Sequence, residues 1–304
     1  MHKISVAICT YNRERYLNQL FNSIIRQTLD KELFEVILID NNSPGNTREL
    51  FQIFSEVNPY IKTRYELERN QGLSYARNRA IQIAEYDFIT FLDDDAFIQE
   101  DYLEKCLLAF SENPRIDVLG GKIILHYESI IPDWENKYLN SILGYFNRGE
   151  QAFTFDKKAY PRGSNMTFKR AVFSKIGLFN VALGRTDKSM IGGEEKELFD
   201  RAYSANLMVF YDPKVVVFHS VPVERTFPAF VRRQAIGIGM SERFRTRNKS
   251  VHLYVFRIFK EIIFWAGSLV LFLSFVLKSQ LPKAKMIIKF RFWLSQGLLG
   301  IKEE

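Results

Sequence analysis

The chain has few cysteines, Cys9 and Cys106 among 304 residues. Two cysteines so far apart provide neither a disulfide framework nor metal-ligand spacing, which excludes a small disulfide-rich fold and a cysteine-held metal. They are typical of a reducing compartment, where each is expected to be a small buried side chain. Internal repeats and low-complexity segments are lacking too, and a content of 47% hydrophobic and 25% charged residues excludes bulk disorder.

Long apolar segments are also scarce. Residues 3–8 are too few for a secretory signal, so none is expected. The uncharged segment 262–277 has 16 residues, fewer than the ~20 that cross a bilayer comfortably. Charge is distributed unevenly, because residues 225–304 carry 15 Lys and Arg against 4 Asp and Glu, whereas residues 1–224 carry 27 against 31. This asymmetry predicts two parts, a main domain over 1–224 and a basic, helical C-terminal region over 225–304.

Strand and helix patterns alternate along the first part, which predicts an α/β fold with a mostly parallel sheet flanked by helices. Ligands of such sheets bind beyond the carboxyl ends of the strands. Residues 128–160 are irregular and aromatic and predict a long loop region over the site. The predicted strands are 4–10, 34–39, 61–67, 87–92, 117–127 and 208–218, and the predicted helices are 47–57, 73–85, 100–112, 168–177 and 194–205.

Three consecutive aspartates, Asp93, Asp94 and Asp95, follow the apolar residues 88–92. Carboxylates at the end of a buried strand are costly unless their charge is compensated. A divalent cation compensates it most simply, and Mg²⁺ and Mn²⁺ prefer hard oxygen ligands and often arrive bound to nucleotide phosphates. A solvated acidic loop is the alternative for the triplet taken alone.

Three further motifs accompany the triplet, and Asp40 ends an earlier apolar strand. In chain order the motifs are Asn70-Gln71-Gly72 with Arg77 and Asn78, then Gly163-Ser164-Asn165-Met166, then Gly192-Gly193-Glu194-Glu195. This ordered set resembles the family-2 glycosyltransferases over residues 4–220, and it is more specific than any one of its motifs. The resemblance implies a GT-A fold, a nucleotide-sugar donor, and a catalytic domain over 1–224.

The resemblance also implies roles for single residues. Those expected to contact the nucleotide sugar are Thr10, Tyr11, Asp40, Gly72, Arg77, Asn78, Asp93, Asp94 and Asn165. A carboxylate such as Asp40 can accept from a base N–H, and Gly72 permits close backbone approach. The alternatives are a cap or Asx-turn role for Asp40 and a solvated helix face for the arginines, which we favour for Arg79.

The expected metal ligands are Asp95, Asp93 and His219, for Mn²⁺ or Mg²⁺. A lone His after an apolar strand is more often structural, but relatives carry one at this place. The expected catalytic residues are Glu195, as general base, and its supporting neighbour Glu194. The family more often has Asp at the position of Glu195. Acidic residues in a first helical turn are also favoured by the helix dipole alone.

The C-terminal region combines basic residues with a long apolar segment. Lys260 and Lys278 flank residues 262–277, and residues 286–301 alternate basic and apolar positions. These features favour a hairpin that docks on a membrane surface, over a buried helix hairpin or an oligomer contact. Because the basic residues border an apolar segment instead of lining a polar face, nucleic-acid binding is not expected.

The sequence therefore predicts a metal-dependent, inverting glycosyltransferase at the cytoplasmic face of the cell membrane. It would move a sugar from a UDP, GDP or dTDP donor to a saccharide or lipid-linked hydroxyl during polysaccharide synthesis. A nucleotidyltransferase and a non-catalytic membrane scaffold on a degenerate transferase fold remain the alternatives.

Overall fold

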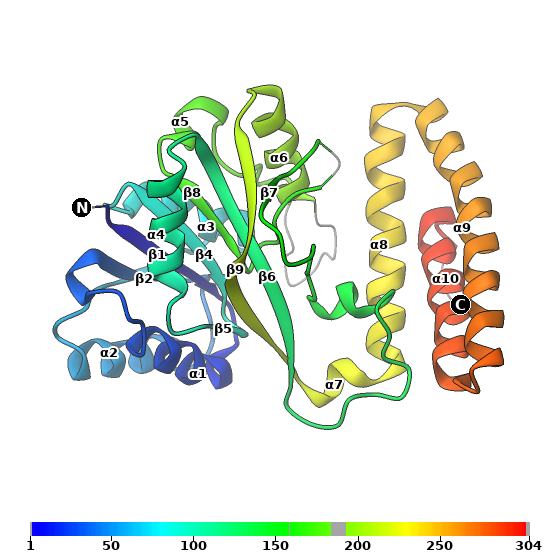
Figure 1. Ribbon diagram of the computed structural model, residues 1–304, viewed down its shortest axis with the longest axis horizontal. Helices are drawn as coiled ribbons and strands as arrows, with labels where there is room; N and C mark the ends of the chain where they lie inside the picture. The colour runs from blue at the N-terminus through cyan, green and yellow to red at the C-terminus, as the bar shows by residue number, and fades with distance from the viewer. Residues whose placement is uncertain (1, 158, 184–192, 302–304) are drawn as a thin grey trace. The chain divides into compact units, whose positions relative to one another are not determined.

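The computed structural model describes residues 2–157, 159–183 and 193–301. The chain divides into two compact units. The first comprises Met1–His126 and Tyr145–Ser220, and the second comprises Tyr127–Gly144 and Val221–Glu304. The elements of both units are labelled in Figure 1.

The first unit contains a parallel group of strands, in the order β3 (Lys62–Leu67), β2 (Phe34–Asp40), β1 (Ile4–Thr10) and β4 (Phe88–Asp93). The helices that connect these strands are α1 (Glu14–Ile25), α2 (Thr47–Val57) and α3 (Leu73–Ile83). Every residue of β2 is buried, as expected for a strand of a sheet that is covered on both faces. The α/β prediction is confirmed by this arrangement.

The rest of the sheet pairs mainly antiparallel. Beyond β4 the order is β8 (Met166–Lys169), β6 (Ile116–Tyr127), β9 (Met208–Val221) and β5 (Ala96–Ile98). The short strand β7 (Phe153–Thr154) pairs with β9 off this path. Strand β8 runs antiparallel to both β4 and β6. The helices of this part are α4 (Tyr102–Glu112), α5 (Val172–Ile176) and α6 (Glu194–Ser204).

The predicted helix 168–177 is wrong in its first part. Residues 166–169 form β8, and only 172–176 are helical. The side chains of Met166 and Phe168 are fully buried, because β8 fills the place between β4 and β6. The predicted long loop 128–160 contains little regular structure, with a 3-10 turn at Asn140–Leu143 and the strand β7.

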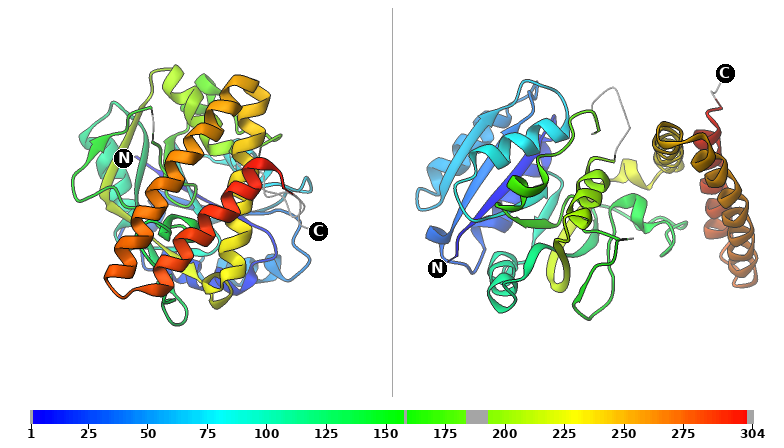
Figure 2. Two further views of the ribbon diagram at one scale, coloured as in Figure 1. Left: turned by 90° about the vertical axis from the view of Figure 1, so that its right-hand side faces the viewer. Right: turned by 90° about the horizontal axis from the view of Figure 1, so that it is seen from above.

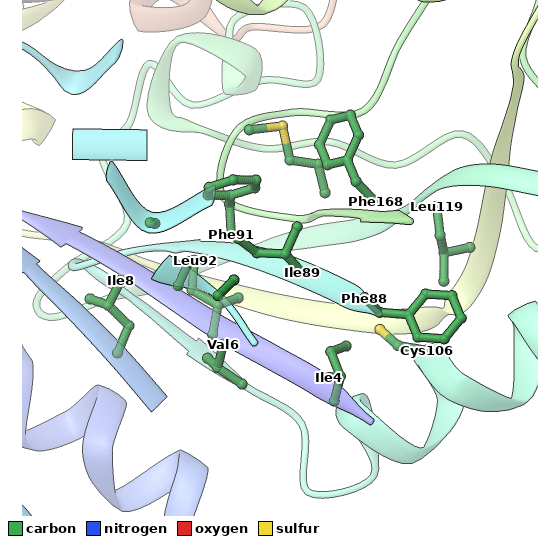
Figure 3. Packing of buried hydrophobic residues seen from close by; sticks show 14 of the residues in the cluster. Ile4, Val6, Ile8, Phe88, Ile89, Phe91, Leu92, Cys106, Leu119 and Phe168 are labelled. Carbon is green, nitrogen blue, oxygen red and sulfur yellow. The ribbon is translucent and has the colours of Figure 1, made fainter. Parts of the chain in front are cut away.

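Aliphatic and aromatic side chains from β1, β4, β6 and β8 form the core of this unit (Figure 3). Ile4 pairs with Phe88, and Ile8 pairs with Leu92, so two strands present apolar side chains at matching heights. Cys106 is buried in this core as expected, whereas Cys9 is only partly buried. The packed interior fixes the ends of β1 and β4, where the polar residues begin.

The second unit is helical. It contains the short α7 (Val223–Thr226) and three long helices, α8 (Pro228–Lys249), α9 (Val251–Leu277) and α10 (Leu281–Leu299) (Figures 1 and 2). The segment from 127–144 belongs to the same unit, where the Trp134 indole donates a 2.7 Å hydrogen bond to the carbonyl of Thr226. Helix α9 is long and apolar enough to cross a membrane, by length and composition.

Candidate active site

Three neighbouring strands end together at one edge of the sheet. In the parallel register Thr10 of β1 lies beside Asp40 of β2, and Cys9 of β1 lies beside Asp93 of β4. The sequence placed Asp40 and the aspartates at strand ends, and the register brings these ends side by side. Polar side chains therefore converge where the apolar strands stop.

Asp93 is the last residue of β4, and Asp94 and Asp95 form the turn between β4 and β5. Asp94 accepts a 2.8 Å hydrogen bond from the Thr10 hydroxyl, and the carbonyl of Asp95 accepts one from the backbone of Ser220 in β9. Burial and the charge of Asp95 raise the pKa of Asp94 to about 7, although Arg13 and the Thr10 hydroxyl oppose the shift. The turn is thus held from β1 on one side and from β9 on the other.

Asp93, Asp95 and His219 offer ligand atoms that all lie within 4.8 Å of one another. His219 lies within β9, opposite Ala96, and not after the end of the strand as the sequence suggested. Its Nε2 is 3.2 Å from Asp95 Oδ1. Two carboxylates and an imidazole at this spacing fit a divalent metal ion of the Mn²⁺ type, which accepts both oxygen and nitrogen ligands.

Arg13 was not predicted as a site residue. Its guanidinium lies 2.7 Å from Asp95 Oδ2, and its side chain is 39% exposed. Arg13 lies between the end of β1 and the start of α1. A basic residue so soon after the first predicted strand could have been recognised from the sequence as a site candidate. Arg13 offsets part of the charge of the triplet in this structure.

Arg77 connects the aspartates to the glutamates. Its guanidinium lies 3.2 Å from Glu195, 3.4 Å from Glu194 and 3.7 Å from Asp93, and its side chain is only 2% exposed. The ring of Phe179 packs on the guanidinium at 5.3 Å. Helix α3 therefore aims its arginine at both groups of carboxylates.

Glu194 and Glu195 begin helix α6. The side chain of Glu194 is 6% exposed and that of Glu195 is 21% exposed, so Glu195 is the more accessible to a second substrate. Burial raises the pKa of Glu195 while Arg77 lowers it, and the net direction is upward. The preceding Gly193 is described, whereas Gly192 of the same motif lies outside the described residues.

Gly163 approaches the ion pair closely. A Cβ at this position would lie 2.1 Å from Glu195 Oε1 and 2.4 Å from Arg77 Nη2. Only a residue without a side chain leaves these two atoms in place. The Gly163-Ser164-Asn165 motif thus contributes its glycine to the carboxylate site.

The Asp40 carboxylate accepts two hydrogen bonds of 2.8 Å, from the Tyr65 hydroxyl and from the Ser43 amide. The second contact is a local turn of the kind weighed for this residue from the sequence. Asp40 is 4% exposed, and Tyr11 just after β1 is partly buried. The contacts fix the Asp40 carboxylate at the end of β2, beside Thr10.

Asn41 holds the glycine turn and was not predicted. Its side-chain amide donates to the carbonyls of Glu68 and Asn70, and its side-chain oxygen accepts from the amide of Gly72 at 2.8 Å. Gly72 has φ of 143°, a conformation that favours glycine. The short polar residue after Asp40 therefore ties the end of β2 to the start of α3.

The side-chain amides of Asn78 and Asn165 form hydrogen bonds with other residues of the protein. Asn78 makes two 2.9 Å hydrogen bonds with the backbone of Phe179. Asn165 donates to the carbonyls of Lys122 and Val215 and accepts from the Tyr102 hydroxyl, with 1% of its surface exposed. These contacts fit a supporting position beneath the site better than contact with a sugar.

Replacement of Arg77 by Met is expected to destabilise the first unit by about 3–5 kcal/mol, because three carboxylates lose their buried partner. The loss is expected to be smaller at acid pH, where the unpaired carboxyls are protonated and need no compensation. Thermal unfolding at pH 5 and pH 8 measures both effects. Arg79→Met, which removes a half-exposed pair with Glu66, is the matched control with a loss of at most about 1 kcal/mol. Equal losses for both variants would contradict the role of Arg77.

Comparisons with known proteins agree with this geometry. A family model described as Glycosyl transferase family 2 matches residues 5–177. Glucosyl-dolichyl phosphate glucuronosyltransferase of Haloferax volcanii is 26% identical over 230 residues, which cover 74% of this chain and 71% of that protein. Succinoglycan biosynthesis protein ExoM of Rhizobium meliloti is 24% identical over 240 residues, covering 78% and 73%. Several other matched proteins are longer, and the matched region spans 13% to 29% of them.

Among solved structures, the mannosyltransferase PcManGT from Pyrobaculum calidifontis, in complex with GDP-Man and Mn²⁺, superposes with a TM-score of 0.62. The alignment covers 99% of this chain and 88% of that one at 15% identity, so it supports the fold alone. The family model covers more than half of the 304 residues. The chain therefore belongs to glycosyltransferase family 2, and it is a glycosyltransferase.

Proposed function

We propose that this enzyme is a metal-dependent, inverting glycosyltransferase. Its donor is a nucleoside-diphosphate sugar, and its acceptor is a hydroxyl on a saccharide or a lipid-linked saccharide in polysaccharide synthesis. The observation that carries the proposal is the position of Arg77, which contacts both the metal-side carboxylate Asp93 and the glutamates of α6. A leaving-group site and a base site are thereby held in one rigid arrangement.

Asp93, Asp95 and His219 would hold the metal ion, Mn²⁺ or Mg²⁺. The imidazole favours Mn²⁺, because Mg²⁺ prefers an all-oxygen set. When bound, the ion supplies Lewis-acid stabilisation of the negative charge on the diphosphate. Asp94 lies against the Thr10 hydroxyl beside this cluster, where it can position the ribose or water around the metal.

Glu195 is the proposed general base. Its carboxylate takes the proton of the acceptor hydroxyl as that oxygen attacks the anomeric carbon. The bond between the anomeric carbon and the diphosphate oxygen breaks, and the nucleoside diphosphate leaves with the bonding electrons. Glu194 shares the Arg77 guanidinium with Glu195, which keeps the base oriented.

The nucleotide would lie over the ends of β1 and β2. In this proposal Thr10, Tyr11 and Asp40 would surround the base, and Gly72 and Arg77 at the start of α3 would follow along the nucleotide. Asn78 and Asn165 would play a supporting role, since their side-chain amides bind backbone groups of neighbouring segments. The Asp40 carboxylate can accept from a base N–H if the Tyr65 hydroxyl or the Ser43 amide shares its oxygens.

We assign residues 1–224 to catalysis and residues 225–304 to membrane docking. The match to a dolichyl phosphate-dependent enzyme and the basic C-terminal region support an acceptor at the cytoplasmic face of a membrane. Partners are then the sugar nucleotide, the acceptor and the lipid surface, and no nucleic acid is required.

Asp95→Ala is expected to abolish transfer, because the metal site loses a central ligand. Thermal shift with UDP or GDP and Mn²⁺ measures binding, and a ligand at about 100 times its Kd adds about 2.7 kcal/mol of stability to the unmodified enzyme. The variant is expected to show no such shift. Asp200→Ala, at an exposed position of α6, is the control with unchanged turnover and shift. Near-normal turnover of Asp95→Ala with metal present would refute the assignment.

Glu195→Gln is expected to lower kcat by a factor of about 10²–10⁴ and to leave the thermal shift by donor and metal unchanged. Because the pKa of Glu195 is raised, the unmodified enzyme is expected to lose activity on the acid side at a higher pH than an ordinary glutamate would cause. A pH profile of kcat tests this. A Gln variant that transfers sugar normally, or that no longer binds donor, would exclude Glu195 as the base.

Gly163→Ala is expected to reduce transfer while changing stability little, because its methyl group displaces the flexible ends of Glu195 and Arg77 and no backbone atom lies as close. The measurements are kcat and thermal unfolding. Gly267→Ala in α9, where a Cβ meets nothing within 4 Å, is the matched control. A Gly163→Ala enzyme with full activity would show that the base tolerates displacement.

A further inference from the structure

Helix α9 is reversed in polarity compared with a helix in a water-soluble bundle. Among its 27 residues, all of which the structure describes, the buried ones are Glu261 and Ser268. Its large apolar side chains are exposed, among them Phe259 at 61%, Ile263 at 69% and Val270 at 67%. A soluble bundle places its apolar stripe inside and its charges outside. This helix does the opposite.

A connected polar network joins α9 to α10 inside the three-helix bundle, whereas the buried residues of α8 and α10 themselves are mostly apolar. Glu261 accepts from Arg257 at 2.8 Å, from Arg291 of α10 at 3.1 Å and from the Ser295 hydroxyl at 3.0 Å. Arg291 also donates to the Ser268 hydroxyl at 3.2 Å. Interhelical hydrogen bonds of this kind join helices in an apolar solvent, where burial of apolar side chains provides no driving force.

Small residues allow α8 and α10 to approach closely. A Cβ on Gly239 of α8 would lie 2.2 Å from the carbonyl oxygen of Leu294, and one on Gly297 of α10 would lie 2.2 Å from that of Ile236. Interfaces between membrane helices are enriched in small residues that allow such close contact. The close contact of α8 and α10 is independent of the polar network, and it also indicates an apolar solvent around the bundle.

The charges around this apolar face indicate whether it contacts a second copy of the chain or a lipid surface. Lys260 and Lys278 are exposed at the two ends of the uncharged part of α9, and Lys285 and Lys289 are exposed on α10. Residues 225–304 carry 15 basic against 4 acidic residues. A second copy of the chain would bring these like charges together, whereas anionic lipid headgroups attract them.

The helix lengths indicate how the bundle meets the lipid. Helix α9 as a whole is long enough to span a membrane, but its uncharged part, 16 residues, is about 24 Å long, shorter than the ~30 Å hydrocarbon core. A spanning hairpin would also place Lys289 and Arg291 of α10 within hydrocarbon, at a cost of about 2.5–3.5 kcal/mol each near the centre. A helix lying in the interface avoids both problems, since its lysines reach the headgroups.

We propose that the exposed apolar face of α9, which includes Phe259, Ile263 and Val270, lies in the plane of an anionic bilayer surface. On the buried side of α9, the polar network around Glu261 joins this helix to α10. This inference rests on the membrane-docking part of the proposed function and names the face, the orientation and the lipid charge.

The test uses the full-length enzyme and sedimentation with vesicles of phosphatidylglycerol and phosphatidylcholine, or of phosphatidylcholine alone. The unmodified enzyme is expected to bind the anionic vesicles at least about ten-fold more strongly, since each nearby Lys contributes about 1 kcal/mol. The variant with Phe259→Gln, Ile263→Gln and Val270→Gln is expected to lose at least about ten-fold in binding. Glutamine keeps the helix propensity of the segment high.

The control carries Ile53→Gln, Val57→Gln and Leu108→Gln, which alter equally exposed apolar positions of the first unit, and it is expected to bind vesicles normally. Donor thermal shift, expected to be retained by both triple variants, verifies their folding. Vesicle binding unaffected by the α9 changes would overturn the proposal. So would a dimer of the unmodified enzyme that those changes convert to monomers, which would assign the face to a second copy.

Orientation is tested with Phe259→Trp and Val270→Trp, each in a background in which the three native tryptophans are replaced by phenylalanine, by quenching with brominated lipids. Quenching of both at the same shallow depth is expected, and clearly different depths would overturn the in-plane orientation. Because vesicle binding needs no transfer reaction, its failure is distinguishable from failure of the proposed activity. A docked enzyme without transfer would refute the activity alone.

Discussion

The site depends on one buried cation. Arg77, 2% exposed, lies within 3.7 Å of Asp93, Glu194 and Glu195, three carboxylates from two distant parts of the chain. Carboxylates gathered at the end of an apolar sheet repel one another, and burial raises the free energy of their charged forms. A planar, permanently charged guanidinium can face several of them at once, which a lysine could not do. Buried ion pairs add little net stability, so this arrangement is better explained by what it holds in place.

The two ends of the carboxylate cluster are compensated differently. Arg77 faces the glutamates from a buried position, whereas Arg13 pairs with Asp95 from a side chain that is 39% exposed. An exposed partner can move away at little cost, but a buried one cannot. In the proposed mechanism, a cation that arrives with a diphosphate would replace Arg13 at Asp95 while Glu195 keeps its buried partner. The proposed metal site would thus be adaptable, and the proposed base would be held in place.

The features that could be predicted from the sequence are those that depend on residues adjacent in the chain. The apolar segments before Asp40 and Asp93 predicted strand ends, because a local pattern defines both the strand and its end. The last two residues of β8, Phe168 and Lys169, were predicted as helix, since this segment is a strand only by pairing with β4 and β6, far away in the sequence. Arg77 was expected beside the nucleotide, and its actual partners at Glu194 and Glu195 lie 117 and 118 residues later. Asn41 stayed unnoticed for the same reason, because its partners Glu68, Asn70 and Gly72 become neighbours only in the fold.

One physical rule accounts for both units, although their patterns are opposite. In both units a buried charge lies next to a partner of opposite charge. At the strand ends of the first unit this partner is Arg77, and in the helical unit Arg257 and Arg291 face Glu261. Counting uncharged residues favours only a short apolar segment at 262–277, yet the helix continues from Val251 to Leu277, with Arg257 and Glu261 turned inward and Lys260 exposed. Composition cannot distinguish a helix with an exposed apolar face from a helix of a soluble hairpin, because the same residues would make a soluble hairpin if their apolar side chains faced inward. The direction in which Glu261 and Phe259 point is what separates a lipid-facing helix from a core helix, and that direction is set by partners on α10 that lie about 30 residues later.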